Sequence, residues 1–507
     1  MIDPHMNRAD PAFATQREDF VPTGSPITSK PIEAGRVARQ RRRATIITQE
    51  WAPTLLLLLL DILVWTLIYG GATSLRHEVF EPTAFESVII NLLQIGVLIG
   101  ALYTIGGYDR HNEMRGLSYT TEHVLAVAAS LIFSSFLIYS LATFAHSMKP
   151  SRGVLLVSFV LFAPISLVYR RWIRASVATT TAGKTYLVIG AGEAAANFYE
   201  AYQHSPNAQQ LCFVDPLGDR IGQLLAGEGS PMVQGNLQAA LSAPGSNYSG
   251  IILAEKIKRL PADLLEGLVR AQFHTTRVYT MESFYETHWR YVPLEVMDPV
   301  WPLQTGFQLA RISPYHYLKR LFDVAVSGAL LVICSPLMGF IACLVWLTSG
   351  RPAIYFQTRM GRENHPFTVY KFRTMILRPP EEDEDIYTRK DDPRVTRTGR
   401  WLRKLRLDEL PQLWNVFRGD MSLIGPRAEW IKCADRYEKK IPLYHFRHLV
   451  KPGITGWAQV NYPYGESEKD AIEKLKYDLY YIRHYSLKLD AMIVLKTVHT
   501  MLFGKGR

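Results

Sequence analysis

The stretch from Arg400 to Gln412, Arg-Trp-Leu-Arg-Lys-Leu-Arg-Leu-Asp-Glu-Leu-Pro-Gln, decides how this chain is interpreted. Its four cations precede two adjacent carboxylates, Asp408 and Glu409, at the head of an apolar segment. Acids near the positive end of a helix are ordinary. Cations that neutralise phosphates, beside acids that attack phosphorus or bind Mg²⁺, are also the minimal set for phosphoryl transfer. The stretch alone leaves both interpretations open, and its surroundings favour the second.

Apolar residues make up 48% of the 507-residue chain and are concentrated in long runs. Four runs approach or exceed the roughly 20 residues that cross a bilayer core, and the fourth is the shortest: 51–71, 85–106, 124–144 and 154–169. Arginines precede the first run and follow the fourth, so both ends of this four-helix unit, 49–173, should face the cytoplasm. We expect the basic tail over 1–48 to be disordered and its first five residues to be a cloning remnant.

The net charge of +11 would suit two classes of partner, nucleic acid and an anionic membrane surface. Basic residues cluster beside apolar runs and around acids, so the charge indicates an anionic membrane surface rather than nucleic acid. The four cysteines are scattered without a metal-type spacing, and a cytoplasmic location keeps them reduced.

A β-type run enters a glycine turn after the fourth apolar run. Gly190 and Gly192 form a Gly-x-Gly-x-x-Ala pattern, and Asp215 ends the next apolar run at the spacing of a ribose-binding acid. Runs at 251–254 and 276–279 predict further strands. The pattern predicts a Rossmann-like domain over 184–305, which is either a nucleotide site at these three residues or a structural or regulatory module.

A fifth apolar run, about 321–348, contains Ser335-Pro336 near its middle and has cations on both flanks. Proline removes a helix hydrogen bond, and a neighbouring serine can satisfy the freed carbonyl. After four spans the run begins in the cytoplasm, and basic residues on both sides favour keeping both ends there. We therefore expect a re-entrant helix hairpin, with a plain proline-kinked span as the alternative.

Cationic and glycine-bearing turns follow this run in a definite order. They are Tyr370-Lys371-Phe372-Arg373, the Asp408-Glu409 run, Gly425-Pro426-Arg427 and Lys451-Pro452-Gly453-Ile454-Thr455-Gly456. Each is weak alone, but in this order they resemble the bacterial sugar transferase family over about 313–507. These proteins are monotopic polyprenol-phosphate sugar-1-phosphate transferases. The front of the chain resembles the larger members, which carry four membrane helices and a Rossmann-like domain.

The resemblance implies a role for each matching residue. Asp408 would be the nucleophile, and Glu409 would bind Mg²⁺ with Asp408 beside the metal. Four cations would hold phosphates or shape the pocket: Lys371, Arg373, Arg403 and Arg427. Ser335-Pro336 would break the re-entrant helix, and Asp478, which matches a recurrent family acid, would belong to the substrate-binding residues. Guanidinium groups suit such a site because they bind phosphate oxygens bidentately and stay charged.

The resemblance also implies the fold and the reaction. The fold would be a membrane protein of mixed α and α/β class, with a four-helix transmembrane unit, a Rossmann-like domain, and a re-entrant hairpin joined to a small α/β catalytic domain over 311–507. The enzyme would transfer a sugar 1-phosphate, such as that of glucose or galactose, from a UDP-sugar to undecaprenyl phosphate, releasing UMP through an aspartyl phosphosugar. This is the first membrane step of exopolysaccharide, capsule or O-antigen synthesis. The chain would be a multi-pass protein of the bacterial inner membrane, in contact with membrane lipid, with its catalytic domain in the cytoplasm. Homo-oligomerisation is left open.

Two other functions remain open at this point. A membrane-bound nucleotide-sugar dehydratase or epimerase needs a Tyr-x-x-x-Lys pair, for which Tyr315 and Lys319 are the plausible match. A regulatory scaffold of polysaccharide assembly would use the Rossmann-like module as a sensor. Many family members carry Asn-Gly-Arg after a Gln-Val pair, whereas this chain has Asn461-Tyr462-Pro463-Tyr464-Gly465, which leaves the donor sugar open.

Overall fold

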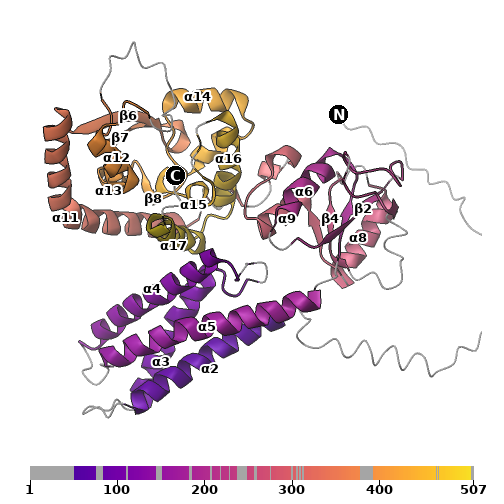
Figure 1. Cartoon of the computed structure of the whole chain (residues 1–507), viewed down its shortest axis with the longest axis horizontal. Coiled ribbons are helices and arrows are strands. Elements are labelled where there is room, and N and C mark those ends of the chain that lie inside the picture. Colours follow the sequence, from indigo (N-terminus) through magenta and orange to yellow (C-terminus); the bar gives the residue numbers. More distant parts are fainter. Residues whose placement is uncertain are drawn as a thin grey trace, which may run out of the picture. The chain divides into compact units, whose positions relative to one another are not determined.

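The computed structural model shown in Figure 1 describes the chain from residue 51 to residue 503. The gaps in this range are 76–83, 110–111, 113, 144–150, 182–184, 206–207, 217, 228, 237–247, 256–259, 275, 298–300, 304–305, 308–309, 311–312, 377–391, 464 and 466. The tail predicted over 1–48 lies outside the described residues.

Four long apolar helices come first among the described residues. They are α2 (Ala52–Ser74), α3 (Ala84–Thr104), α4 (Leu117–Leu141) and α5 (Arg152–Thr181). Each is long and apolar enough to cross a membrane. Helix α5 is longer than the apolar run that predicts it, because it continues through basic residues. One of these, Arg170, forms a fully buried ion pair with Asp61 of α2, as charged side chains within membrane segments usually do.

The Rossmann-like part is a five-stranded parallel sheet in the order β3-β2-β1-β4-β5. Its elements are β1 (Thr185–Ile189), α6 (Glu193–Gln203), β2 (Gln210–Asp215), β3 (Gly235–Asn236), β4 (Tyr248–Leu253), α8 (Ala262–His274), β5 (Val278–Thr280) and α9 (Met281–His288). Alternate residues of β1 face opposite sides. Val188 packs with Phe198 and Phe284 of α6 and α9, whereas Leu187 packs with Leu268 of α8. The predicted parallel α/β sheet is confirmed.

The remaining part carries the Asp408-Glu409 pair and combines helices with two small sheets. Its elements are η4 (Leu294–Val296), η5 (Trp301–Leu303), α11 (Tyr315–Ser349), β6 (Ile354–Met360), η6 (Arg362–Asn364), β7 (Pro366–Phe372), α12 (Arg397–Lys404), η8 (Leu407–Glu409), α13 (Gln412–Arg418), β8 (Ser422–Ile424), α14 (Ile431–Lys440), η9 (Tyr444–Leu449), β9 (Gly453–Thr455), α15 (Trp457–Asn461), α16 (Glu468–Arg483) and α17 (Leu487–Phe503). Strands β6 and β7 form an antiparallel hairpin, and β8 pairs with β9 in parallel.

The core of this part begins ahead of the region that resembles the family. Val292, Trp301, Phe307 and Ala310 are buried in one cluster with residues of α14, α16 and α17. The segment that follows the Rossmann-like sheet therefore supplies side chains that the last part of the chain needs to complete its core.

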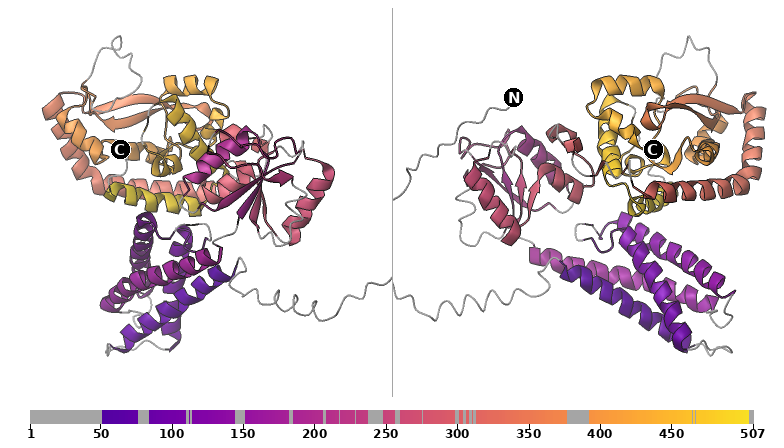
Figure 2. Two further views of the ribbon diagram at one scale, coloured as in Figure 1. Left: turned by 45° about the vertical axis from the view of Figure 1, so that its right-hand side comes forward. Right: turned by 180° about the vertical axis from the view of Figure 1, so that it is seen from behind.

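Helix α11 bends sharply within one continuous helix, as the coral ribbon in Figures 1 and 2 shows. Pro336 lies inside it and cannot donate to the carbonyl of Val332, four residues earlier. The hydroxyl of Ser335 donates to that carbonyl instead, at 2.8 Å. The sequence predicted that this serine satisfies the freed carbonyl. The helix itself continues past Pro336.

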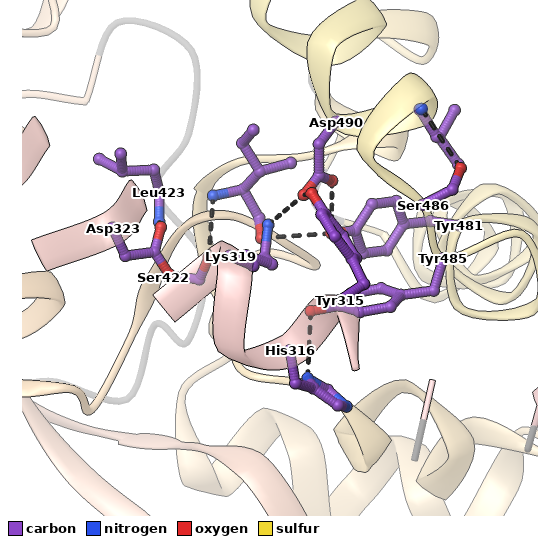
Figure 3. Close-up of polar contacts among 12 residues, drawn as sticks. Tyr315, His316, Lys319, Asp323, Ser422, Leu423, Tyr481, Tyr485, Ser486 and Asp490 are labelled. Atoms are coloured by element: carbon purple, nitrogen blue, oxygen red, sulfur yellow. Dashed lines mark hydrogen bonds and ion pairs between the residues drawn. The ribbon is translucent and has the colours of Figure 1, made fainter. Parts of the chain in front are cut away.

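Both ends of α11 are fixed to the part that carries the acid pair. Near its start, Lys319 pairs with buried Asp490 of α17, and the carboxylate of Asp323 accepts from the backbone N–H of Leu423 at 3.0 Å (Figure 3). At its end, the guanidinium of Arg373 donates to the carbonyls of Ser349, Gly350 and Arg351. The two arms of the bent helix therefore leave from and return to the same small domain.

Candidate active site

Asp408 and Glu409 lie in the short turn η8, which joins α12 to α13. Arg406, just before it, adopts a left-handed φ of 58° that reverses the chain. Both acids point inward, and each residue is only 8% exposed. Two carboxyl groups in such a setting repel each other unless cations compensate them.

Two cations from other segments compensate Glu409. Its Oε1 atom receives the ammonium of Lys371 at 3.1 Å and the guanidinium of Arg427 at 3.1 Å. Lys371 is on β7, and Arg427 is in the turn that follows β8. The structure thus brings together three segments whose order along the chain carried the resemblance.

The two acids differ in their protonation properties. Burial raises the pKa of Glu409, but the nearby charges of Lys371 and Arg427 outweigh burial and hold that pKa well below its usual range. Burial and the neighbouring Glu409 raise the pKa of Asp408. Burial also lowers the pKa of Lys371 to about 8. The pair therefore consists of a firmly ionised Glu409 and an Asp408 whose charge is weakly compensated.

Asp408 keeps an unsatisfied oxygen. Its Oδ1 atom is buried and has no hydrogen-bond partner among the described residues. The positive charges of Lys371, Arg403 and Arg427 act on it without neutralising it. Arg403 of α12 is oriented by Thr374, whose hydroxyl accepts from its Nε at 2.9 Å. A buried carboxylate oxygen left without a partner is costly unless a ligand meets it.

Among the described residues, Arg373 makes no hydrogen bond or ion pair with either acid. Its side chain is buried, and two of its nitrogens are engaged with the last carbonyls of α11, so it closes the end of the bent helix. Alternation along a strand places Lys371 and Arg373 on one face. Arg373 follows the end of β7, however, where the chain leaves the strand. Its contacts fit the expected use in shaping the pocket, and phosphate binding by Arg373 stays a prediction.

Asp478 stabilises the site indirectly, through Arg447. It is buried on α16 and accepts two hydrogen bonds from Arg447, at 3.1 and 2.9 Å. Arg447 also donates to the backbone carbonyl of Arg427 at 3.1 Å. Asp478 therefore acts through Arg447 on the turn that presents Arg427 to Glu409.

Sequence reasoning missed two arginines that hold the same turn. Besides Arg447, Arg359 of β6 donates to the carbonyl of Ala428 at 2.7 Å. Each contact joins positions that are far apart in the chain, and each accepting group is a backbone carbonyl. No residue pattern reports such a carbonyl, so the sequence offered no signal for either arginine.

The acid pair fits the demands of Mg²⁺. No cluster of three or more histidine, cysteine or carboxylate side chains forms among the described residues. Mg²⁺ keeps several waters and often takes only one or two carboxylates together with substrate phosphates. The ionised Glu409, with Asp408 next to it in η8, provides such a carboxylate.

The glycine turn of the Rossmann-like part is tight, and its acid is already engaged. Gly190 has a φ of 120°, and a Cβ there would lie 3.0 Å from the backbone nitrogen of Glu255. Asp215 accepts from the backbone N–H of Arg220 at 2.9 Å, and the Arg220 side chain donates to the carbonyl of Ala191 at 2.7 Å. Gly192 caps α6 in an extended conformation. These contacts give Gly190 and Asp215 structural partners, and the nucleotide site stays a prediction.

The fold and this site define a class: a membrane protein in which a buried acid pair, held by lysine and arginine, lies on a small domain tied to both ends of a bent apolar helix. The chain belongs to the bacterial sugar transferase family, whose model matches residues 314–504. The resemblance seen in the motifs is confirmed.

Three relatives illustrate this membership. The exopolysaccharide production protein PSS of Rhizobium leguminosarum bv. phaseoli is 40% identical over 37% of this chain and 98% of its own length. The UDP-N-acetylgalactosamine-undecaprenyl-phosphate N-acetylgalactosaminephosphotransferase of Aeromonas hydrophila is 44% identical over 39% of this chain and 48% of its own. The undecaprenyl-phosphate glucose phosphotransferase of Komagataeibacter xylinus is 39% identical over 41% of each chain. The chain thus spans about half or less of the length of these last two relatives.

Proposed function

We propose that this protein transfers a sugar 1-phosphate from a UDP-sugar to undecaprenyl phosphate and releases UMP. The observation that carries the proposal is the asymmetry of the acid pair. Glu409 is held by Lys371 and Arg427, while the Oδ1 atom of Asp408 is buried without a partner. A buried carboxylate oxygen that no protein group engages is suited to attack an electrophile.

In the first step, a carboxylate oxygen of Asp408 forms a bond to the phosphorus that carries the sugar. The bond from that phosphorus to the oxygen bridging the two phosphates breaks, and UMP leaves with the electron pair. In the second step, a phosphate oxygen of undecaprenyl phosphate attacks the same phosphorus. The acyl phosphate bond breaks, Asp408 is regenerated, and the lipid carries a diphosphate-linked sugar.

The cations make attack by an anion on an anion feasible. Lys371 and Arg427 already lie against Glu409, and their charges reach Asp408 together with that of Arg403. Positive charge fixed where negative charge develops stabilises the transition state. Mg²⁺ held by Glu409 beside Asp408 would supply further positive charge against the diphosphate oxygens.

The bent helix supports a location at the cytoplasmic face of the bacterial inner membrane. Its two ends are fixed to one small domain through Lys319 and Arg373, so a single membrane face accommodates both. Side chains between the ends, such as Val332, Ile333 and Leu347, are more than two-thirds exposed and apolar. We infer a re-entrant helix that places the acid pair where a soluble UDP-sugar and a lipid phosphate meet.

The contacts of Tyr315 and Lys319 argue against the dehydratase or epimerase alternative. Both side chains bind Asp490, the tyrosine hydroxyl at 2.5 Å, and they belong to the anchor of α11 rather than to the Rossmann-like sheet (Figure 3). A Tyr-x-x-x-Lys pair that acts on a sugar nucleotide would have to face the nucleotide fold.

The donor is proposed only as a UDP-hexose, because the matched relatives are named for different sugars. A panel of UDP-sugars should be assayed for UMP release with and without undecaprenyl phosphate. We expect one donor to dominate and the lipid product to contain its sugar phosphate. Release of free sugar 1-phosphate, or no release from any UDP-sugar by folded protein, would reject the proposal.

A further inference from the structure

A second cationic pocket lies at the other end of β7 from Lys371. Its volume is about 400 Å³. Its lining residues come from the β6–β7 turn, the end of α13 and the segment before β9: Gly361, Arg362, Glu363, His365, Pro366, Phe367, Gly419, Asp420 and Lys451. Pro366 of the pocket and Lys371 are five residues apart on a strand, so their Cα atoms lie roughly 16 Å apart.

Counter-charges compensate the positive groups of this pocket only in part. Lys451 is half-buried, and its ammonium has no hydrogen bond or ion pair among the described residues. The Nε atom of Arg362 is buried without a hydrogen-bond partner, although its Nη2 atom lies 3.3 Å from Glu363. Burial and the neighbouring charge of Arg320 lower the pKa of Lys451. An anion bound between Lys451 and Arg362 would relieve this repulsion.

The pocket also contains negative charge at its edge. Asp420 is partly exposed and lies 3.6 Å from Arg418, and Glu363 is exposed beside Arg362. A simple anion would gain nothing from these carboxylates. A ligand with a phosphate and an amine a few ångströms apart would pair its phosphate with the cations and its amine with a carboxylate.

The pocket lies next to side chains suited to lipid. Arg320 of α11 donates to the carbonyls of Val416 and Phe417 at 2.6 and 2.8 Å, and its guanidinium is packed against Gly419 of the pocket wall. Beside it, Leu321 is 67% exposed and Phe417 is 39% exposed. Exposed apolar groups next to snorkelling cations mark the level of lipid headgroups.

We propose that this pocket binds the phosphoethanolamine headgroup of a membrane phospholipid, with the phosphate on Lys451 and Arg362 and the ammonium facing Asp420. The bound lipid would sit where α11 leaves the domain. This proposal needs only that α11 lies in lipid and does not depend on the transfer reaction.

The test uses the full-length protein in detergent, with bound lipid counted by native mass spectrometry during titration. Lys451→Gln and Arg362→Gln should each weaken phosphatidylethanolamine binding about tenfold. Asp420→Asn should weaken phosphatidylethanolamine binding but not phosphatidylglycerol binding. Lys439→Gln, at an exposed lysine of α14 outside the pocket, is the matched control and should change neither. Melting curves identify any variant that is misfolded, and Lys451→Arg should then restore binding.

Three results would overturn the proposal. The first is unchanged lipid binding by the folded Lys451→Gln/Arg362→Gln double variant. The second is equal loss of both lipids in Asp420→Asn, which would leave the headgroup amine unrecognised. The third is competition by soluble glycerophosphoethanolamine as strong as that of the intact lipid, which would mean a site for soluble phosphate esters.

Discussion

Replacing Asp478 by Asn tests whether a buried ion pair positions the arginine that holds Glu409. Asp478 and Arg447 have side chains 2% and 5% exposed, so the change leaves a guanidinium without its counter-charge inside the domain. Breaking one partner of a buried pair costs roughly 3 to 5 kcal/mol. For a domain of this size that lowers the apparent melting temperature by roughly 10 °C. The transfer rate should fall as well, because the turn carrying Arg427 loses its support.

Replacing both residues by leucine separates stability from activity. Apolar replacement of a whole buried pair is often nearly neutral for stability. The Asp478→Leu/Arg447→Leu variant should therefore recover much of the melting temperature, whereas its transfer rate should stay low because Arg427 still lacks its donor. The control is Asp435→Asn, at an exposed acid on α14, which should change neither measurement. A double variant that regains full activity would show that Arg447 does not position Arg427, and a neutral Asp478→Asn would show that the pair does not matter.

Four further outcomes are expected. Asp408→Asn should remain folded in membranes and lose several orders of magnitude in transfer rate, and retention of roughly a tenth would exclude covalent catalysis by this acid. Because the pKa of Lys371 is lowered to about 8, the positive charge beside Glu409 is lost as the pH rises through that value. The transfer rate should fall there, and Lys371→Arg should move the fall to higher pH, which a pH–rate profile checks. Single cysteines at positions 316 and 363, in a background without the native four, should both react with an impermeant maleimide from the cytoplasmic side. Reaction at 363 only from the periplasmic side would reject the re-entrant helix. A truncation that starts at residue 313 removes Trp301, which is 1% exposed, from the core. It should melt well below one that starts at residue 291, and equal melting would contradict the shared core.

The features that the sequence predicts well are those with a local pattern. Apolar runs locate α2 to α5, the glycine turn locates the start of the sheet, and Ser335 beside Pro336 predicts which group satisfies the carbonyl of Val332. These signals work because one segment contains both the cause and its effect. The acid pair and its cations were located by their order along the chain, which reflects a resemblance rather than a geometry.

The sequence could not predict where side chains point at the ends of helices and strands. Arg373 is a cation like Lys371 and lies only two residues beyond it, yet it binds carbonyls at the end of α11 because β7 ends just before it. Arg447 finds Asp478 31 positions away, and Arg220 finds a carbonyl in the glycine turn. Such pairs depend on how separate elements pack, and no periodicity within one segment encodes that.

The bend in α11 has a mechanical consequence for the bilayer. The helix of 35 residues would extend about 52 Å if straight, well beyond the roughly 30 Å hydrocarbon core. In the proposed re-entrant placement both ends are held at one face, so the volume of the helix would be added to one monolayer and not to the other. Each copy would then act as a wedge that expands the inner monolayer alone. The helix should insert more easily where the inner monolayer is under tension and less easily where the lipids of that monolayer are tightly packed. Local lipid packing would therefore control what fraction of the protein has its helix inserted.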